Sequence, residues 1–225
     1  MIIRIITIHF GTNYGSALQS YALCFYLNRL GHDAKIIDYI PERYGLWRGL
    51  LERHGKYYPK IIIFLYYLMI LPKRSQNRRR FECFLQKYVP LTKKYKTRDS
   101  LINNPPKADL YISGSDQIWN YDYNMESDFS YFLDFAPIDK PLVSYAASFG
   151  KSELSTEETK KFEVLLKRYS LLSVREKSGL NCLRQCNYFG VNVLDPTFLL
   201  GMHEWEKFIG KNKENKNYLL VLSIF

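Results

Sequence analysis

The sequence predicts an α/β protein built on a Rossmann-like, doubly wound parallel sheet. Short β-branched segments alternate with helical patterns along most of the 225 residues, which is the order that produces parallel strands joined by crossover helices. The first unit is the clearest, because an apolar strand at 1–8, a glycine-containing turn at 11–15, a helical pattern at 16–30 and a second strand at 34–39 follow one another directly.

Later elements continue this alternation. Strands are predicted at 108–112, 141–146, 171–174 and 191–194, with a helix that carries 162–169, a second helix at 176–184 and a short helical turn at 203–209. Ser16 is expected to be the N-cap of the first helix and Gly31 its C-cap. Ser155 and Glu158 have the spacing of a capping box.

Residues 41–107 interrupt the alternation and predict a mostly helical insertion that covers the sheet or reaches toward a membrane. Its apolar run at 61–71 is shorter than the ~20 residues of a membrane span, so a buried or interfacial helix is expected. The segment 41–98 holds 15 of the 32 Lys and Arg residues and only three acidic ones. This local surplus predicts peripheral contact with an anionic membrane, whereas the near-neutral remainder argues against nucleic-acid binding.

The sequence predicts one complete domain followed by only the beginning of a second domain. Residues 1–215 are expected to form one Rossmann-like N-terminal domain. Residues 216–225 end in a fully apolar strand pattern, Tyr218–Phe225. Because a buried strand needs partners on both faces, we expect it to be the first strand of a second domain that is otherwise missing.

The cysteines and the start of the chain predict a cytoplasmic protein. None of the four cysteines pairs with another at zinc-ribbon spacing, so we expect reduced thiols and no metal site. The chain opens directly on a strand pattern rather than on a signal peptide. The predicted location is the cytoplasm, with peripheral contact at the inner face of the membrane.

The first candidate site is the turn Thr7–Ser16 after the first strand. Glycines between a strand and a helix let a ligand approach the backbone, and the free N–H groups of a helix start attract an anion. The candidate residues are Gly11, Asn13, Gly15 and Ser16 for substrate binding and His9 for proton transfer. The spacing matches neither the dinucleotide nor the Walker fingerprint, and an ordinary turn with a structural histidine is the alternative.

The second candidate site is Gly114–Asn120, again after a predicted strand. It combines a hydroxyl, a carboxylate, two amides and an indole, which are the groups that proteins use to bind sugars. The candidates are Ser115, Gln117, Trp119 and Asn120 for substrate binding and Asp116 for acid or base catalysis. We expect Asp116, Gln117 and Trp119 to line a concavity; the alternative is a turn in which Asp116 caps a local helix.

Three further segments end predicted strands. The small residues of 144–150, Ser148 among them, imply close approach by a substrate or by another stretch of backbone. Arg175 offers a guanidinium fork for a carboxylate or phosphate, and a surface pair with Glu176 is the alternative. Asp195 is expected to cap a helix entry.

Together these motifs carry a resemblance to the polysaccharide pyruvyl transferase family. The segments that carry it, in the family's order, are 7–23, 114–120, 131–135, 144–150, 173–177 and 194–197. The resemblance implies the N-terminal half of a two-domain, GT-B-like enzyme. Such an enzyme moves pyruvate from phosphoenolpyruvate onto a sugar of a surface polysaccharide as a cyclic ketal. It uses no cofactor beyond this donor, and its acceptor is a sugar or a lipid-linked glycan.

The resemblance also implies catalytic roles for particular residues and a low activity for the chain alone. His9, Asp116 and Arg175 become the catalytic candidates, and donor contacts are expected largely from the missing second domain, so that the chain alone is expected to be weakly active or inactive. One alternative is a nucleotide-binding domain in which Asp38 holds a ribose. The other is a non-catalytic remnant that binds glycan.

Overall fold

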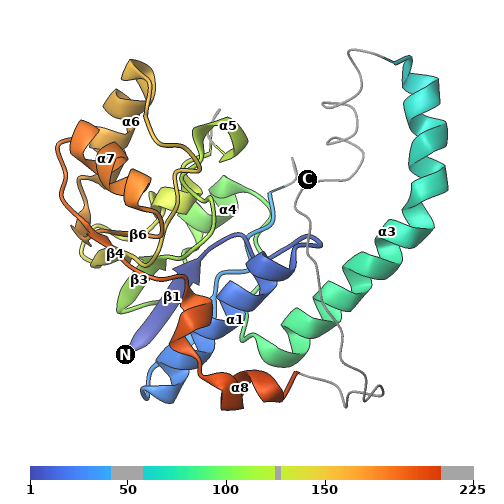
Figure 1. Cartoon of the computed structure of the whole chain (residues 1–225), viewed down its shortest axis with the longest axis horizontal. Helices are drawn as coiled ribbons and strands as arrows, with labels where there is room; N and C mark the ends of the chain where they lie inside the picture. Colours follow the sequence, from blue (N-terminus) through green and yellow to red (C-terminus); the bar gives the residue numbers. More distant parts are fainter. Residues whose placement is uncertain (42–57, 125–127, 209–225) are drawn as a thin grey trace, which may run out of the picture.

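The computed structural model describes residues 1–41, 58–124 and 128–208 and confirms the α/β, Rossmann-like fold (Figure 1). Five parallel strands form one sheet in the order β2-β1-β3-β4-β5. The strands are β1 Ile2–Ile6, β2 Asp33–Ile36, β3 Leu110–Ser113, β4 Leu142–Ser144 and β5 Tyr169–Leu171, and a second, two-stranded sheet pairs β6 Ser173–Val174 with β7 Val191–Asn192. The predicted strand at 218–225 lies outside the described residues.

Helices follow the strands in the order that the sequence predicts. They are α1 Tyr14–Arg29, α3 Lys60–Tyr88, α4 Arg98–Asn103, α5 Tyr121–Asn124, α6 Thr156–Leu166, α7 Lys177–Gln185 and α8 Met202–Glu206, with short 3-10 segments at Ser130–Phe132 and Pro196–Leu199. The insertion is therefore mostly helical in its described part, although residues 42–57 lie outside that part.

The start of α1 differs from the prediction. Asn13, not Ser16, is the N-cap: its backbone is extended and its side chain accepts a hydrogen bond from the Ser16 backbone N–H at 3.4 Å. Ser16 therefore lies inside the first turn, where its hydroxyl is available for another contact. The C-cap is Leu30 and not Gly31, which follows it with a φ of +87° that glycine adopts without strain. The capping box of Ser155 and Glu158 is present as predicted.

Two hydrophobic clusters cover the faces of the sheet. Ile3 and Ile5 belong to a cluster completed by α1, the end of α3 and α8, while Ile6 belongs to one that includes residues of α6 and α7. Because successive residues of a strand point to opposite faces, both faces of β1 are buried. The central strands are therefore held rigidly, and only the loops at their ends are left to form a site.

The long helix α3 divides into two unlike parts. Toward its C-terminus, Phe84 and Leu85 lie against α1 in the cluster that contains Ile3 and Ile5. Toward its N-terminus the helix extends away from the sheet (Figure 1), and Ile61, Leu65 and Met69 are exposed. The prediction of a buried helix at 61–71 is therefore wrong, and the interfacial alternative stays. Among the described residues no helix is long and apolar enough to cross a membrane.

Candidate functional site

The order of the strands locates the candidate site. The chain reverses its direction of winding between β1 and β3, because β2 lies on one side of this pair and β4 and β5 lie on the other. Doubly wound sheets bind ligands outside the carboxyl ends of the strands at such a switch point. The two turns that leave these ends are Thr7–Asn13 and Gly114–Asn120, the turns that the sequence identifies as candidate sites.

The two turns approach each other closely at Gly114. A Cβ atom there would lie 3.1 Å from both the Ile5 Cγ2 and the Thr7 Cβ atoms, so a side chain would require these neighbours to shift by a few tenths of an ångström. The Thr7 hydroxyl donates a hydrogen bond to the Ser115 carbonyl across the same gap. Gly114 thus leaves room for the second turn to lie close against the first.

Asp116 joins the two turns directly. Its Oδ2 accepts a hydrogen bond from the Ser16 hydroxyl at 2.5 Å, and its Oδ1 accepts from the Gln117 backbone N–H at 2.8 Å. The half-buried carboxylate thus lies at the first turn of α1, where the helix dipole favours negative charge. Its own φ is +82°, a conformation that Asp and Asn tolerate better than most residues.

A second polar group forms around Arg175, which follows β6. Its Nε donates to Glu176 Oε1 at 2.7 Å, while its Nη1 lies 3.5 Å from Asp195 Oδ2 and 3.4 Å from the Ser115 hydroxyl. Ser115 in turn donates to Asp195 at 3.0 Å. Burial lowers the pKa of Arg175, but the hydrogen bond to Glu176 and the charges of Glu176, Asp195 and Asp116 outweigh it, so that this pKa is raised overall and the residue stays cationic.

The backbone of Ala147 places the two polar groups side by side. It forms parallel bridges to Asp116 on one side and to Val174 on the other, and its carbonyl accepts from the Arg175 N–H at 3.1 Å. Four predicted site residues are therefore brought into one connected cluster, Ser16, Ser115, Asp116 and Arg175. Together they provide a fixed carboxylate next to a fixed cation.

Asp195 belongs to this cluster but was expected only as a cap. It does cap the following 3-10 turn, because its Oδ1 accepts from the Thr197 backbone N–H at 3.0 Å. Its other oxygen contacts Ser115 and Arg175. The sequence signal for the second role is its position at the end of a strand, which by itself does not separate the two roles.

His9 is buried, unlike the solvent-accessible residues of the candidate site. The residue is 2% exposed, its Nε2 lies 3.2 Å from Asp38 Oδ1 and its Nδ1 lies 3.2 Å from the Thr7 carbonyl oxygen. Both ring nitrogens thus face acceptors inside the protein, and the geometry gives proton transfer by His9 no support. Asp38 is the residue that the nucleotide-binding alternative expects to hold a ribose, and here its carboxylate contacts His9.

Trp119 lies in the hydrophobic core. It is 0% exposed, stacks on Phe132 with ring centroids 5.3 Å apart, and contacts Phe149 and Tyr169 at 5.2 and 5.8 Å. The prediction that Trp119 lines a concavity is therefore wrong, because the indole turns under the loop and completes the core between the sheet and α6. A polar sequence context does not reveal such a turn inward.

The other polar residues of the loop divide between scaffold and surface. Ser115, Asn120 and Ser148 are buried; Asn120 donates to Gln117 Oε1 at 3.0 Å, and Ser148 accepts from the Gly150 N–H at 3.1 Å. The predicted residues that solvent reaches are Gly11, Asn13, Gly15, Asp116, Gln117 and Arg175. These are the groups that a ligand arriving from solvent could contact.

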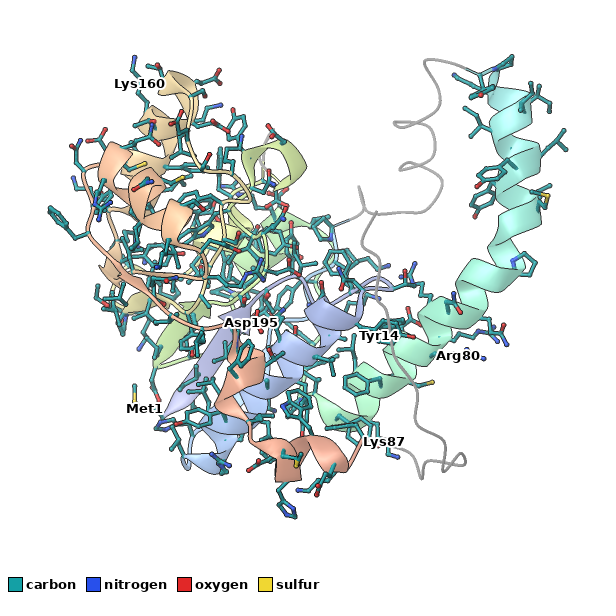
Figure 2. All side chains as sticks on the ribbon, viewed as in Figure 1. Met1, Tyr14, Arg80, Lys87, Lys160 and Asp195 are labelled. Atoms are coloured by element: carbon teal, nitrogen blue, oxygen red, sulfur yellow. The ribbon has the colours of Figure 1, made fainter. Side chains whose placement is uncertain are left out.

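A groove lies beside the first turn, between α1 and α3. It encloses about 260 Å³ and is lined by Thr12, Tyr14, Ala17, Leu18, Asn77, Arg80, Phe81 and Phe84. Tyr14 is 76% exposed with its ring 4.9 Å from that of Phe81, and Figure 2 shows it close to Arg80. Sequence reasoning missed Tyr14, although it stands between two predicted site residues.

The structure is that of a doubly wound α/β protein with a cluster of polar side chains at its topological switch point. Residues 13–224 match the family model described as polysaccharide pyruvyl transferase. No curated protein and no solved structure matches the chain. The chain therefore belongs to the polysaccharide pyruvyl transferase family, which confirms the resemblance and indicates a transferase.

Proposed function

We propose that this protein transfers pyruvate from phosphoenolpyruvate to a sugar of a surface polysaccharide. In this reaction the methylene carbon of the donor gains a proton, the neighbouring carbon forms bonds to two sugar oxygens, and its bond to the phosphate oxygen breaks. The proton of one sugar hydroxyl group balances the proton that the methylene carbon gains as it becomes a methyl group. The proton of the other hydroxyl group leaves with phosphate. Family membership supports the proposal, and the observation that carries it is that Asp116 and Arg175 both lie beside the Ala147 backbone at the switch point.

We assign Arg175 to the donor. Phosphoenolpyruvate carries a carboxylate and a phosphate, and a guanidinium binds either group by paired N–H donors. Its contacts with Glu176, Ser115 and Asp195 use Nε and Nη1, and a guanidinium has five N–H donors in all. The neighbouring carboxylates hold the side chain in place and keep it charged, so that little reorganisation is needed when the anion arrives.

We assign Asp116 to proton transfer from the sugar hydroxyl. The Ser16 and Gln117 hydrogen bonds fix its carboxylate, and solvent still reaches it. A general base must lie within hydrogen-bond reach of the hydroxyl it deprotonates, which the crevice position of Asp116 allows. His9, buried against Asp38, is the weaker candidate.

We assign the acceptor sugar to the groove between α1 and α3. With Trp119 in the core, the exposed aromatic surface next to the crevice is the pair Tyr14 and Phe81. An aromatic face binds the C–H side of a sugar ring, while Asn77 and Thr12 offer an amide and a hydroxyl to its hydroxyl groups. Thr12 and Tyr14 of the groove belong to the turn and helix start that also carry Ser16, the hydrogen-bond partner of Asp116.

We also place the reaction in the cytoplasm, as the sequence predicts. The cysteines Cys24, Cys83, Cys182 and Cys186 are free thiols, which supports a reducing compartment.

The test measures phosphoenolpyruvate binding by calorimetry and phosphate release in the presence of a panel of lipid-linked and nucleotide-linked sugars. Arg175→Gln should weaken donor binding at least ~10-fold, and Asp116→Asn should lower kcat by ~10²–10⁴ with donor binding retained. Lys160→Gln, an exposed change on α6, is the matched control.

Three outcomes would contradict the proposal. If Arg175→Gln and Lys160→Gln bind the donor alike, the cation at the switch point is not a donor site. Glycan binding without any donor binding or phosphate release would favour the non-catalytic alternative, and NAD binding would favour the nucleotide-binding one.

A further inference from the structure

The N-terminal part of α3 presents an exposed apolar surface. The helix has 29 residues and is therefore ~44 Å long, and Pro72 lies inside it. Seven large apolar side chains before Pro72 are 44% to 71% exposed, namely Ile61, Ile62, Phe64, Leu65, Tyr66, Leu68 and Met69. Contiguous exposed apolar surface of this kind marks a docking site on a protein that is otherwise well packed.

Basic residues lie at both ends of this surface. Lys60 is the first residue of the helix, and Arg78, Arg79 and Arg80 follow the apolar part as an exposed group. The one acidic residue of α3, Glu82, pairs with Arg78 at 2.8 Å. The helix therefore carries an apolar surface and a strong positive charge together.

We propose that α3 docks this protein on an anionic lipid bilayer. The seven exposed apolar side chains enter the boundary between headgroups and acyl chains, while Lys60 and Arg79 reach the lipid phosphates with their long side chains. Tyr66 suits this depth, because an aromatic body with a polar tip prefers the membrane interface.

The positive charge of α3 favours an anionic bilayer over a second copy of the chain as the partner of this surface. Two copies that met through α3 would bring two groups of arginines together, with one glutamate on each helix to offset them. Repulsion between like charges opposes that dimer, whereas a leaflet with anionic lipids attracts each basic residue near its surface.

Docking through α3 also orients the groove. Arg80 and Phe81 of the groove lie on the same helix, ~16 Å beyond Met69 along its axis. A sugar in the groove would then lie near the membrane surface, where a lipid-linked glycan presents its sugars. This last step rests on the proposed function; the docking itself does not.

The experiment is co-sedimentation of the chain with vesicles of phosphatidylcholine alone and with vesicles containing about 30% phosphatidylglycerol. Wild type should bind the anionic vesicles and lose most of this binding between ~0.1 and ~0.5 M salt. Lys60→Gln with Arg79→Gln should weaken partitioning about 30-fold, because each basic residue near the surface contributes about fivefold. Leu65→Glu with Met69→Glu should weaken it at least ~10-fold.

The matched controls change the same residue types elsewhere. Lys160→Gln with Lys167→Gln removes two exposed lysines, and Phe189→Glu replaces an exposed aromatic residue. Lys160 lies on the opposite side of the molecule from Arg80 in Figure 2. These controls should bind like wild type, and thermal unfolding of every variant should match wild type because all the changed side chains are exposed.

Equal binding to neutral and anionic vesicles would overturn the proposal. So would an equal loss of binding in the controls. If wild type instead self-associates with no vesicle binding, and Leu65→Glu with Met69→Glu abolishes that association, a second copy covers α3. Because vesicle binding needs neither donor nor acceptor, its failure is distinguishable from failure of the proposed transfer reaction.

Discussion

Trp119→Ala should destabilise the fold far more than it affects sugar binding. The side chain is 0% exposed and lies among Phe132, Phe149 and Tyr169. A buried tryptophan removes about 200 Å² from water, and at about 25 cal/mol per Å² this contributes roughly 5 kcal/mol. Losses measured for buried aromatic residues replaced by alanine, about 3–5 kcal/mol, agree with this value.

Such a loss is a large part of the ~5–15 kcal/mol that stabilises a typical domain. For a chain of this size each kcal/mol lowers Tm by about 2–4 °C, so we expect a fall of roughly 10–20 °C. The assay is thermal unfolding followed by circular dichroism, with Tyr14→Ala as the matched aromatic control. Tyr14 is 76% exposed, so its removal should change Tm by less than ~3 °C while it raises KM for the acceptor.

The reasoning would be refuted if Trp119→Ala unfolded at the wild-type temperature but failed to bind sugar. The indole would then be a ligand platform, as the sequence first suggests. Trp119→Phe gives a graded check, because the smaller aromatic ring retains part of the stacking on Phe132. Its loss of stability should be about half of the loss caused by Trp119→Ala.

Asp116→Asn should fold normally, because Asn also tolerates a φ of +82°, so its kcat should fall while its Tm holds. A thiol reagent at neutral pH should label Cys83 rapidly and the buried cysteines only after unfolding. Burial raises the pKa of the other thiols, to about 12 for Cys24 and Cys186 and about 11 for Cys182. Glu158→Gln should cost about 2 kcal/mol at neutral pH by removing the 2.6 Å pair with Lys151. Burial raises the pKa of Glu158, but hydrogen bonds from Lys151 and the Ser155 N–H lower it overall, so this difference, measured by urea unfolding, should vanish as the pH falls through the lowered pKa.

The fold was predictable because local patterns and the order of the elements determine it. β-branched strands alternate with helices, and right-handed crossovers leave few ways to arrange them. The positions of helix ends were less certain: Asn13 and Ser16 are both good capping residues, and only the path of the turn decides between them.

The site was predictable in its location but not in the direction of its side chains. A turn after a strand shows the same polar residues whether a side chain faces the crevice or the core, so Trp119 and Asp116 looked alike in role. The contact between Arg175 and Asp195 depends on how β6 and β7 pair, which no local pattern reveals. Tyr14 is a candidate because α3 lies beside it and forms a groove with it, an arrangement that no local sequence pattern indicates.

The hydrogen bonds of the site join residues that are far apart along the chain, and this has a consequence for the order of folding. Ser16 and Asp116 are separated by 100 positions, and Ser115 and Asp195 by 80. Contacts of such long range form slowly, because the entropy of closing the intervening loops must be overcome first. During synthesis on the ribosome, Ser16 emerges long before Asp116, and Ser115 emerges long before Asp195. The site is therefore complete only after residue 195 has left the exit tunnel, because Asp195 is the last of these residues to be synthesised.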